Sequence, residues 1–182
     1  ISISSGYKLS TLQILHNLEQ AYILDLGRES NNRNIEYLSL ARMVAHKTYI
    51  SLELLSNRAK SETLYDDGLI KGFLSTPQES YMMHQGEKFI ERFTPESYLS
   101  IIKGWQNFKI EQEDLNKLKD IETLIISVDS DVCFYPDEQK DFLAVLNNHE
   151  INTTYTTINS TKGHDSFLLE PELFEDTLKN FL

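Results

Sequence analysis

The sequence predicts an α/β protein in which a long helical segment interrupts a parallel sheet. Three observations support this prediction: a short strand-like stretch opens the chain, helical periodicity fills most of residues 10–119, and strand-like and helix-like segments alternate in the last third. We therefore divide the 182 residues into a core strand (1–8), a large helical lid insertion (9–119) and a strand–helix–strand–helix part of the core (120–182).

The first two predicted elements are a short strand and a helix. The opening residues ISISSGYK alternate and then reach a glycine, which is typical of a strand that enters a turn. Ser10 and Gln13 have the spacing of a capping box and predict a helix start, whereas Gly27 predicts its end. An apolar stripe at helical spacing predicts the face that this helix turns toward the core; it consists of Leu12, Leu15, Leu18 and Tyr22.

The middle of the chain contains three further helical patterns. The run NIEYLSLARMVAHKTYISLELLSNR has the periodicity of a helical region. The next run, TPQESYMMHQGEKFIERF, begins with Thr76 as a cap, Pro77 at the first helical position and Glu79 three residues after the cap. TPESYLSIIKGWQNF repeats the Thr-Pro start, so we expect helices to continue to about Lys119.

After Lys119 the pattern becomes that of an α/β unit. IETLIISVDSD is a continuous apolar run that ends in acids, which predicts a strand buried on both faces of a parallel sheet. YPDEQKDFLAVLNNH predicts a helix with a proline near its start, and INTTYTTINS has the alternation and β-branched residues of a strand. EPELFEDTLKNFL predicts a closing amphipathic helix.

Composition and charge argue against several classes of partner. The net charge of −11 disfavours binding to nucleic acid or to an anionic membrane, because both are negative themselves. No apolar run approaches the roughly 20 residues that span a bilayer. The single cysteine, Cys133, cannot form an internal disulfide, which fits a cytoplasmic location; it follows an acid that would raise its pKa, so we expect it to pack rather than react. The histidines show no metal-ligand spacing, so we expect no metal site.

Two candidate catalytic residues follow the two predicted strands of the last third. Asp131 comes just after LIISV, and His164 comes just after INTTYTTINS. Because parallel strands end at the same edge of a sheet, the two side chains can meet there, and the carboxylate can fix the imidazole tautomer during proton transfer. Asp129 is an alternative acid, although it can also cap a turn. The alternative for His164 is a solvated loop residue.

Four stretches carry a resemblance to a known family: SLARMVAHKTYIS, ESYMMHQGEKFIERFTPESYL, SVDSDVCFYPDEQ and GHDSFL. Together they closely resemble homoserine O-acetyltransferases of the α/β-hydrolase superfamily. The resemblance implies that the chain is the C-terminal part of an α/β-hydrolase fold, with residues 1–5 as a core strand. It also implies that Asp131 and His164 are the triad acid and base. Asp165 matches the aspartate that holds the amino group of the amino-acid substrate in the family.

The resemblance implies acetyl transfer from acetyl-CoA, as a co-substrate, to the hydroxyl of a small amino-acid-like acceptor, with no bound cofactor. The serine nucleophile of this family follows a Gly-x-Ser-x-Gly turn. The sequence contains no such turn, so we expect the serine to lie upstream of Ile1 and the 182 residues alone to be inactive. There are two alternatives: the protein hydrolyses an ester or thioester, or the chain has a non-catalytic role as a lid or dimerisation fragment. The family also implies a homodimer formed through the lid helices.

One position departs from the family pattern. The first lid helix of the family carries an arginine that binds the substrate carboxylate, and Glu19 stands at that position in NLEQAYILD. A carboxylate there reverses the local field, so we expect an acceptor without a carboxylate at this point. The aromatic pairs Phe89/Phe93 and Tyr81/Tyr98 either line an acyl tunnel or pack between helices.

Overall fold

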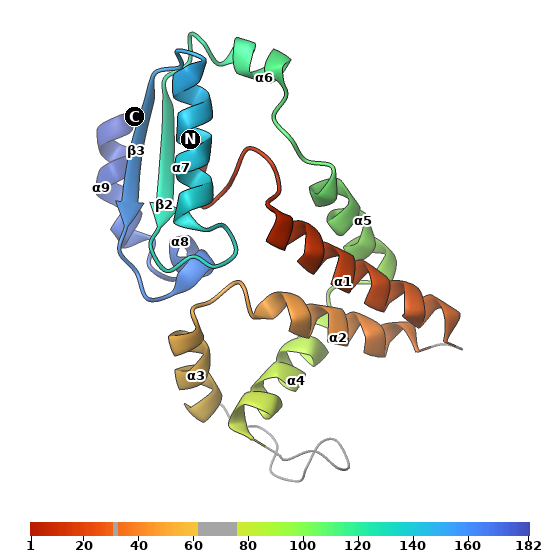
Figure 1. Cartoon of the computed structure of the whole chain (residues 1–182). Coiled ribbons are helices and arrows are strands. Elements are labelled where there is room, and N and C mark those ends of the chain that lie inside the picture. The colour runs from red at the N-terminus through yellow and green to blue at the C-terminus, as the bar shows by residue number, and fades with distance from the viewer. Residues whose placement is uncertain (31–32, 62–75) are drawn as a thin grey trace. The chain divides into compact units, whose positions relative to one another are not determined.

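The computed structural model of the chain describes residues 1–30, 33–61 and 76–182 (Figure 1). These residues form two compact units. We call them the sheet unit, which comprises Ile1–Ser10, Thr48–Ser51 and Phe108–Leu182, and the helical unit, which comprises Thr11–Lys47 and Leu52–Asn107. Within the described residues, no helix is long and apolar enough to cross a membrane.

A three-stranded parallel sheet organises the sheet unit. Its strands are β1 (Ser2–Ile3), β2 (Thr123–Val128) and β3 (Thr153–Ile158), in the order β1-β2-β3. All six residues of β2 are buried, as the continuous apolar run predicts for a central strand covered on both faces. The register pairs Val128 with Ile158, so β2 and β3 end side by side.

Helices cover both faces of this sheet. Figure 1 shows α7 (Pro136–Asn148) and α9 (Glu172–Phe181) on opposite sides of β2 and β3. The core on the α7 side consists of Leu115, Ile125, Phe142, Leu146 and Ile151, and the core on the α9 side consists of Leu124, Ile126, Val128, Ile158 and Phe174. Each fully buried aliphatic side chain of this kind contributes roughly 1.5–3 kcal/mol. Two short helices complete the unit, α6 (Gln112–Lys117) and α8 (Ser166–Leu169).

The boundary of the helical unit differs from the one that the sequence suggests. The unit ends at Asn107, whereas the helical pattern continues to Lys119. The reason is Leu115 of α6, which is buried in the core on the α7 side of the sheet. Helical periodicity does not reveal which core a helix joins.

The described residues of the helical unit form the helices α1 (Thr11–Glu29), α2 (Asn34–His46), α3 (Leu52–Ser61), α4 (Pro77–Ile90) and α5 (Pro95–Gln106). Both Thr-Pro starts are confirmed, since Thr76 and Thr94 each form a capping box with a proline at the helix start. The core of the unit consists of Leu24, Leu38, Ala41, Phe89, Tyr98 and Ile102.

The aromatic side chains of the helical unit pack against one another. The ring of Phe89 stacks on Phe93 at 4.4 Å between centroids and meets Tyr98 edge-on at 5.0 Å. Tyr81 lies apart from this group, with its ring 5.7 Å from that of His46. Burial, and then the nearby charge of Arg42, lower the pKa of His46 to about 4, so this histidine is neutral at physiological pH. The contacts match the packing alternative for these aromatic residues.

The predicted buried face of α1 is wrong. Its stripe Leu12, Leu15, Leu18 and Tyr22 is 42–61% exposed, and the buried residues are Gln13, Asn17, Gln20, Leu24 and Gly27. Hydrogen bonds to α5 explain the choice: Asn17 Nδ2 donates to Gln106 Oε1 at 3.0 Å, and the Tyr98 hydroxyl donates to Gln20. These bonds to Asn17 Nδ2 and Gln20 Oε1 reduce the cost of burying the two polar side chains on this face.

Two further helix predictions need correction. α1 continues past Gly27 to Glu29, because this glycine serves a close approach rather than an end: a Cβ there would lie 2.8 Å from the Cβ of Tyr37. The run from residue 34 to 58 is not one helical stretch, since α2 ends at His46 and α3 begins at Leu52. The interruption, Thr48–Ser51, belongs to the sheet unit.

Candidate functional site

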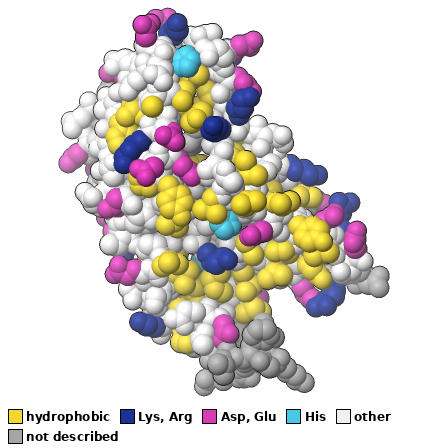
Figure 2. Space-filling view, in the orientation of Figure 1, with side chains coloured by type: hydrophobic (Ala, Val, Ile, Leu, Met, Phe, Trp, Pro, Cys, Tyr) yellow, Lys and Arg dark blue, Asp and Glu magenta, His cyan; other side chains and the backbone are white. Residues whose placement is uncertain are grey.

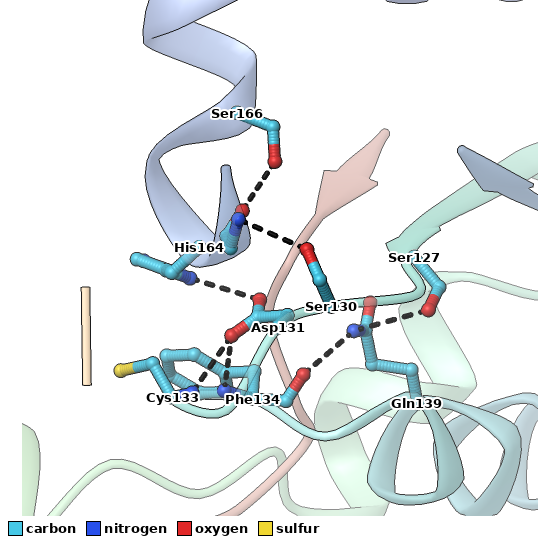
Figure 3. A network of polar contacts seen from close by, with 9 residues as sticks. Ser127, Ser130, Asp131, Cys133, Phe134, Gln139, His164 and Ser166 are labelled. Atoms are coloured by element: carbon cyan, nitrogen blue, oxygen red, sulfur yellow. Dashed lines mark hydrogen bonds and ion pairs between the residues drawn. The ribbon is translucent and has the colours of Figure 1, made fainter. Parts of the chain in front are cut away.

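The structure brings Asp131 and His164 together at the end of the sheet. Asp131 follows β2 and His164 follows β3, and the in-register pairing of these strands places both loops at one edge. His164 Nδ1 lies 3.0 Å from Asp131 Oδ2 (Figure 3). Asp131 is only 1% exposed. A buried carboxylate that bonds one imidazole nitrogen is the arrangement of an acid–base pair.

The Asp131 carboxylate is fixed by its own loop. Its Oδ1 accepts hydrogen bonds from the backbone N–H groups of Cys133 at 2.8 Å and Phe134 at 2.9 Å, which leaves Oδ2 directed at His164 (Figure 3). These donors compensate for the burial of the carboxylate. Because both carboxylate oxygens accept, His164 Nδ1 must carry the proton of the shared bond. The neutral imidazole then presents Nε2 as an acceptor.

Aromatic rings hold the imidazole plane. The Phe134 ring stacks on His164 at 5.4 Å between centroids, the Phe167 ring meets it edge-on at 5.7 Å, and Tyr49 lies at 6.4 Å. The His164 side chain is 18% exposed. Across residues 1–30, 33–61 and 76–182, Nε2 has no hydrogen-bond partner. The ring is therefore oriented at Nδ1 by Asp131 while the side chain stays partly exposed, which is compatible with proton transfer.

A tight turn carries His164. It is the 3₁₀ turn η1 (Gly163–Asp165), and Gly163 has a φ of +76°, a conformation that favours glycine. A Cβ on Gly163 would lie 2.6 Å from the backbone nitrogen of Ser51. Two backbone hydrogen bonds join the same segments: Asp165 N–H donates to Tyr49 O at 2.9 Å, and Ser51 N–H donates to Lys162 O at 3.3 Å.

The segment Thr48–Ser51, which holds this turn, lies within a run that has helical periodicity, so its role is not apparent from the sequence. Three of its four residues are β-branched or Ser, which disfavours a helix interior slightly. That weak signal was available. The contacts themselves are mostly made by backbone atoms, and those leave no pattern in the side chains.

The structure separates the two candidate acids. Asp129 is exposed, and its Oδ1 accepts a hydrogen bond from the backbone N–H of Ser160 at 2.9 Å. Asp129 thus links the loop after β2 to the loop after β3, which matches the alternative that it caps a turn. Of Asp129 and Asp131, it is Asp131 that contacts His164.

Cys133 has no nucleophilic character in this site. Burial, and then the neighbouring charge of Asp131, raise the pKa of its thiol to about 12. The thiol therefore stays protonated at physiological pH, and the side chain packs in the core as the sequence predicts.

The two predicted substrate-binding residues lie in different units. Asp165 is half-buried and directly follows His164 in the sheet unit. Glu19 lies on α1 in the helical unit, where its side chain is 59% exposed and Oε2 is 3.6 Å from His16 Nδ1. Among the described side chains, no group of three His, Cys, Asp or Glu residues is arranged to hold a metal ion.

Sequence comparison shows which curated proteins the chain is similar to. No protein family model matches the chain. The chain is 38% identical over 195 residues to a homoserine O-acetyltransferase of Methanosalsum zhilinae, in an alignment that spans all of the chain and 39% of that protein. A homoserine O-acetyltransferase of Methanobrevibacter ruminantium is 37% identical over 150 residues, which cover 80% of the chain and 31% of that protein.

The chain is therefore similar to homoserine O-acetyltransferases along its whole length. It spans less than half the length of the curated relatives it matches. One similar protein of this group, from Magnetococcus marinus, is named a homoserine O-succinyltransferase; it is 34% identical over 151 residues, which cover 80% of the chain and 38% of that protein.

Solved structures agree on the fold of this family. A homoserine O-acetyltransferase from Bacillus anthracis superposes with a TM-score of 0.81 at 14% identity, covering 98% of the chain and 51% of that structure. Esterase E22 superposes with a TM-score of 0.83 at 13% identity, covering 99% of the chain and 53% of that structure. The fold of the chain therefore corresponds to about half of an α/β-hydrolase.

Proposed function

We propose that the complete protein transfers an acetyl group from acetyl-CoA to the hydroxyl of a small amino-acid-like acceptor. Asp131 and His164 serve as acid and base of a Ser-Asp-His triad, and the serine lies in a part of the protein outside these 182 residues. The observation that carries the proposal is the buried Asp131 carboxylate bonded to Nδ1 of His164, whose side chain is still partly exposed. The similarity to homoserine O-acetyltransferases supports the reaction class.

The proposed reaction needs two proton transfers at His164 Nε2. In the first half, Nε2 takes the serine hydroxyl proton as the serine oxygen attacks the thioester carbonyl, and then returns it to the departing CoA thiolate. In the second half, Nε2 takes the acceptor hydroxyl proton as that oxygen attacks the acetyl-serine, and returns it to the serine. Asp131 stabilises each imidazolium through the 3.0 Å bond.

A single-turnover experiment tests this proposal. We expect the full-length protein to gain one acetyl group from acetyl-CoA, seen by intact mass, and to release it to homoserine or a related amino alcohol. His164→Ala should gain none, and neither should the 182 residues alone, because they contain no Gly-x-Ser-x-Gly turn. Succinyl-CoA is the control donor. Acetate release without transfer would indicate a hydrolase, and acetylation of a serine among the 182 residues would contradict the proposed position of the nucleophile.

Glu19 is the basis of a proposal about the acceptor. We propose that it faces the acceptor in the complete protein, so that the acceptor lacks a carboxylate at this point or is cationic there. Glu19→Arg should then lower the KM for homoserine by about tenfold, because a bidentate Arg–carboxylate pair becomes possible. Asp25→Arg is the matched control, since it makes the same charge change on α1 at a side chain that is 60% exposed. Efficient homoserine acetylation that neither substitution changes would contradict this role.

The exposed stripe of α1 supports a homodimer through the helical unit. Leu15, Leu18 and Tyr22 recur at helical spacing and are 48–61% exposed. Figure 2 shows that hydrophobic side chains are numerous on the surface of the molecule. We expect Leu18→Asp to shift the full-length protein toward the monomer in sedimentation velocity. Leu168→Asp, at a 67% exposed leucine of α8 in the sheet unit, should not. A monomeric unmodified protein would contradict the dimer.

A further inference from the structure

One serine hydroxyl lies between the loop that carries Asp131 and the turn that carries His164. Ser130 Oγ accepts a hydrogen bond from the backbone N–H of Gly163 at 2.9 Å and donates to the carbonyl of Ser160. Ser130 directly precedes Asp131, and Gly163 directly precedes His164. A single side chain therefore spans the gap between the two candidate catalytic residues, one position before each.

The neighbouring residue strengthens this connection. Asp129 Oδ1 accepts a hydrogen bond from the backbone N–H of Ser160. The backbone N–H and C=O of Ser160 are therefore both bound by side chains of the loop that follows β2. The opposite side of the turn is held by the backbone bonds to Tyr49 and Ser51. The turn is thus held by two sets of contacts, one with Ser130 and one with Tyr49 and Ser51. The contacts with Ser130 are the ones made by the loop that carries Asp131.

We propose that Ser130 is a positioning residue of the acid–base pair. Its hydroxyl sets the separation between the Asp131 carboxylate and the His164 imidazole by fixing the turn against the loop after β2. This role rests on the proposed triad. Without the hydroxyl, Gly163 N–H and Ser160 C=O lose their partners. The Asp129–Ser160 bond then remains on the β2 side, and the Gly163 turn is held mainly by its contacts to Thr48–Ser51. The His164–Asp131 bond then lengthens and the imidazole loses its orientation.

The test uses the full-length protein with three changes at Ser130. Ser130→Ala should lower kcat about 10- to 100-fold, since a displacement of about 1 Å at a catalytic group has an effect of this size. KM for the acyl donor should stay within about twofold, because no substrate contact changes. Ser130→Thr keeps a hydroxyl and should restore most of kcat, and Ser130→Cys, a weaker hydrogen-bonding group, should fall between Thr and Ala. The expected order of kcat, Thr above Cys above Ala, can still be tested with two of the variants if the third folds poorly.

A spectroscopic measurement separates positioning from general destabilisation. The proton shared by His164 Nδ1 and Asp131 gives a far-downfield proton NMR resonance, which His164→Ala identifies by its loss. Ser130→Ala should weaken or shift this resonance. Ser127→Ala is the matched control: it removes another hydroxyl from the same segment, fully buried on β2, whose contact is Gln139 at 3.5 Å rather than the turn. That variant should keep the resonance and its kcat.

Each outcome decides the proposal. An unchanged resonance in Ser130→Ala, or an equal loss of kcat and resonance in Ser127→Ala, would overturn the positioning role. A resonance lost in Ser130→Ala and kept in Ser127→Ala would support it. The same NMR result in a protein that forms no acetyl-enzyme would refute the proposed function and leave the positioning role standing, so the two failures are distinguishable.

Discussion

Replacement of Asp131 by asparagine is expected to lower the turnover of the full-length protein by about 10⁴-fold, the loss that the same change causes in serine proteases. The site gives a specific reason. One side-chain oxygen of residue 131 accepts two backbone N–H groups, from Cys133 and Phe134, and an asparagine oxygen would keep that place. The amide NH₂ then faces His164 Nδ1 and requires this nitrogen to accept. Nε2 would carry the proton and could not act as a base.

The measurement is kcat for acetyl-CoA consumption, with circular dichroism to show that the fold persists. Asp129→Asn is the control. Its amide oxygen can still accept from Ser160 N–H, so we expect less than about a fivefold loss, given that an exposed hydrogen bond is worth about 1 kcal/mol or less. If Asp129→Asn were the more damaging change, the assignment of Asp131 as the acid would be wrong.

The proximity of Asp131 and His164, the proposed acid–base pair, could be predicted from the sequence because it depends on simple features. The apolar run LIISV predicts a buried parallel strand, and the alternating Thr, Ile and Tyr residues predict its neighbour. Parallel strands end at one edge of the sheet, so an acid after the first and a histidine after the second are brought close together. The 3.0 Å contact of Asp131 with His164 agrees with this reasoning.

The buried face of α1 could not be predicted in the same way. Hydrophobic periodicity identifies a stripe, but it does not distinguish a stripe that faces the core from one that is exposed. Which face of α1 is buried depends on hydrogen bonds to α5. Gln106 bonds Asn17, 89 residues away in the sequence, and Tyr98 bonds Gln20, 78 residues away. Such specific polar pairs give no periodic signal, because each is a single contact between distant positions.

The turn of His164 also depends on distant residues, and Gly163 is the position where this dependence can be measured. Gly163→Ala should lower the free energy of unfolding by roughly 2–5 kcal/mol, from the cost of a positive φ and from the clash of a new methyl group with packed backbone. The neighbours are Ser51 N at 2.6 Å and Ile50 C at 2.9 Å, and backbone atoms cannot move aside as a flexible side chain can. The turn must therefore shift away from Thr48–Ser51.

Because His164 directly follows Gly163, the same shift should reduce catalysis. We expect kcat/KM of the full-length Gly163→Ala protein to fall at least about 100-fold, as a displacement of about 1 Å in the base would cause. Urea unfolding and acyl transfer together provide the measurement. Gly104→Ala is the matched control: this glycine lies on the exposed face of α5 with no atom within 4 Å of a new Cβ, so alanine there should stabilise the helix by up to about 1 kcal/mol. Equal stability of the two alanine variants would show that the Gly163 turn does not depend on its close approach to Thr48–Ser51.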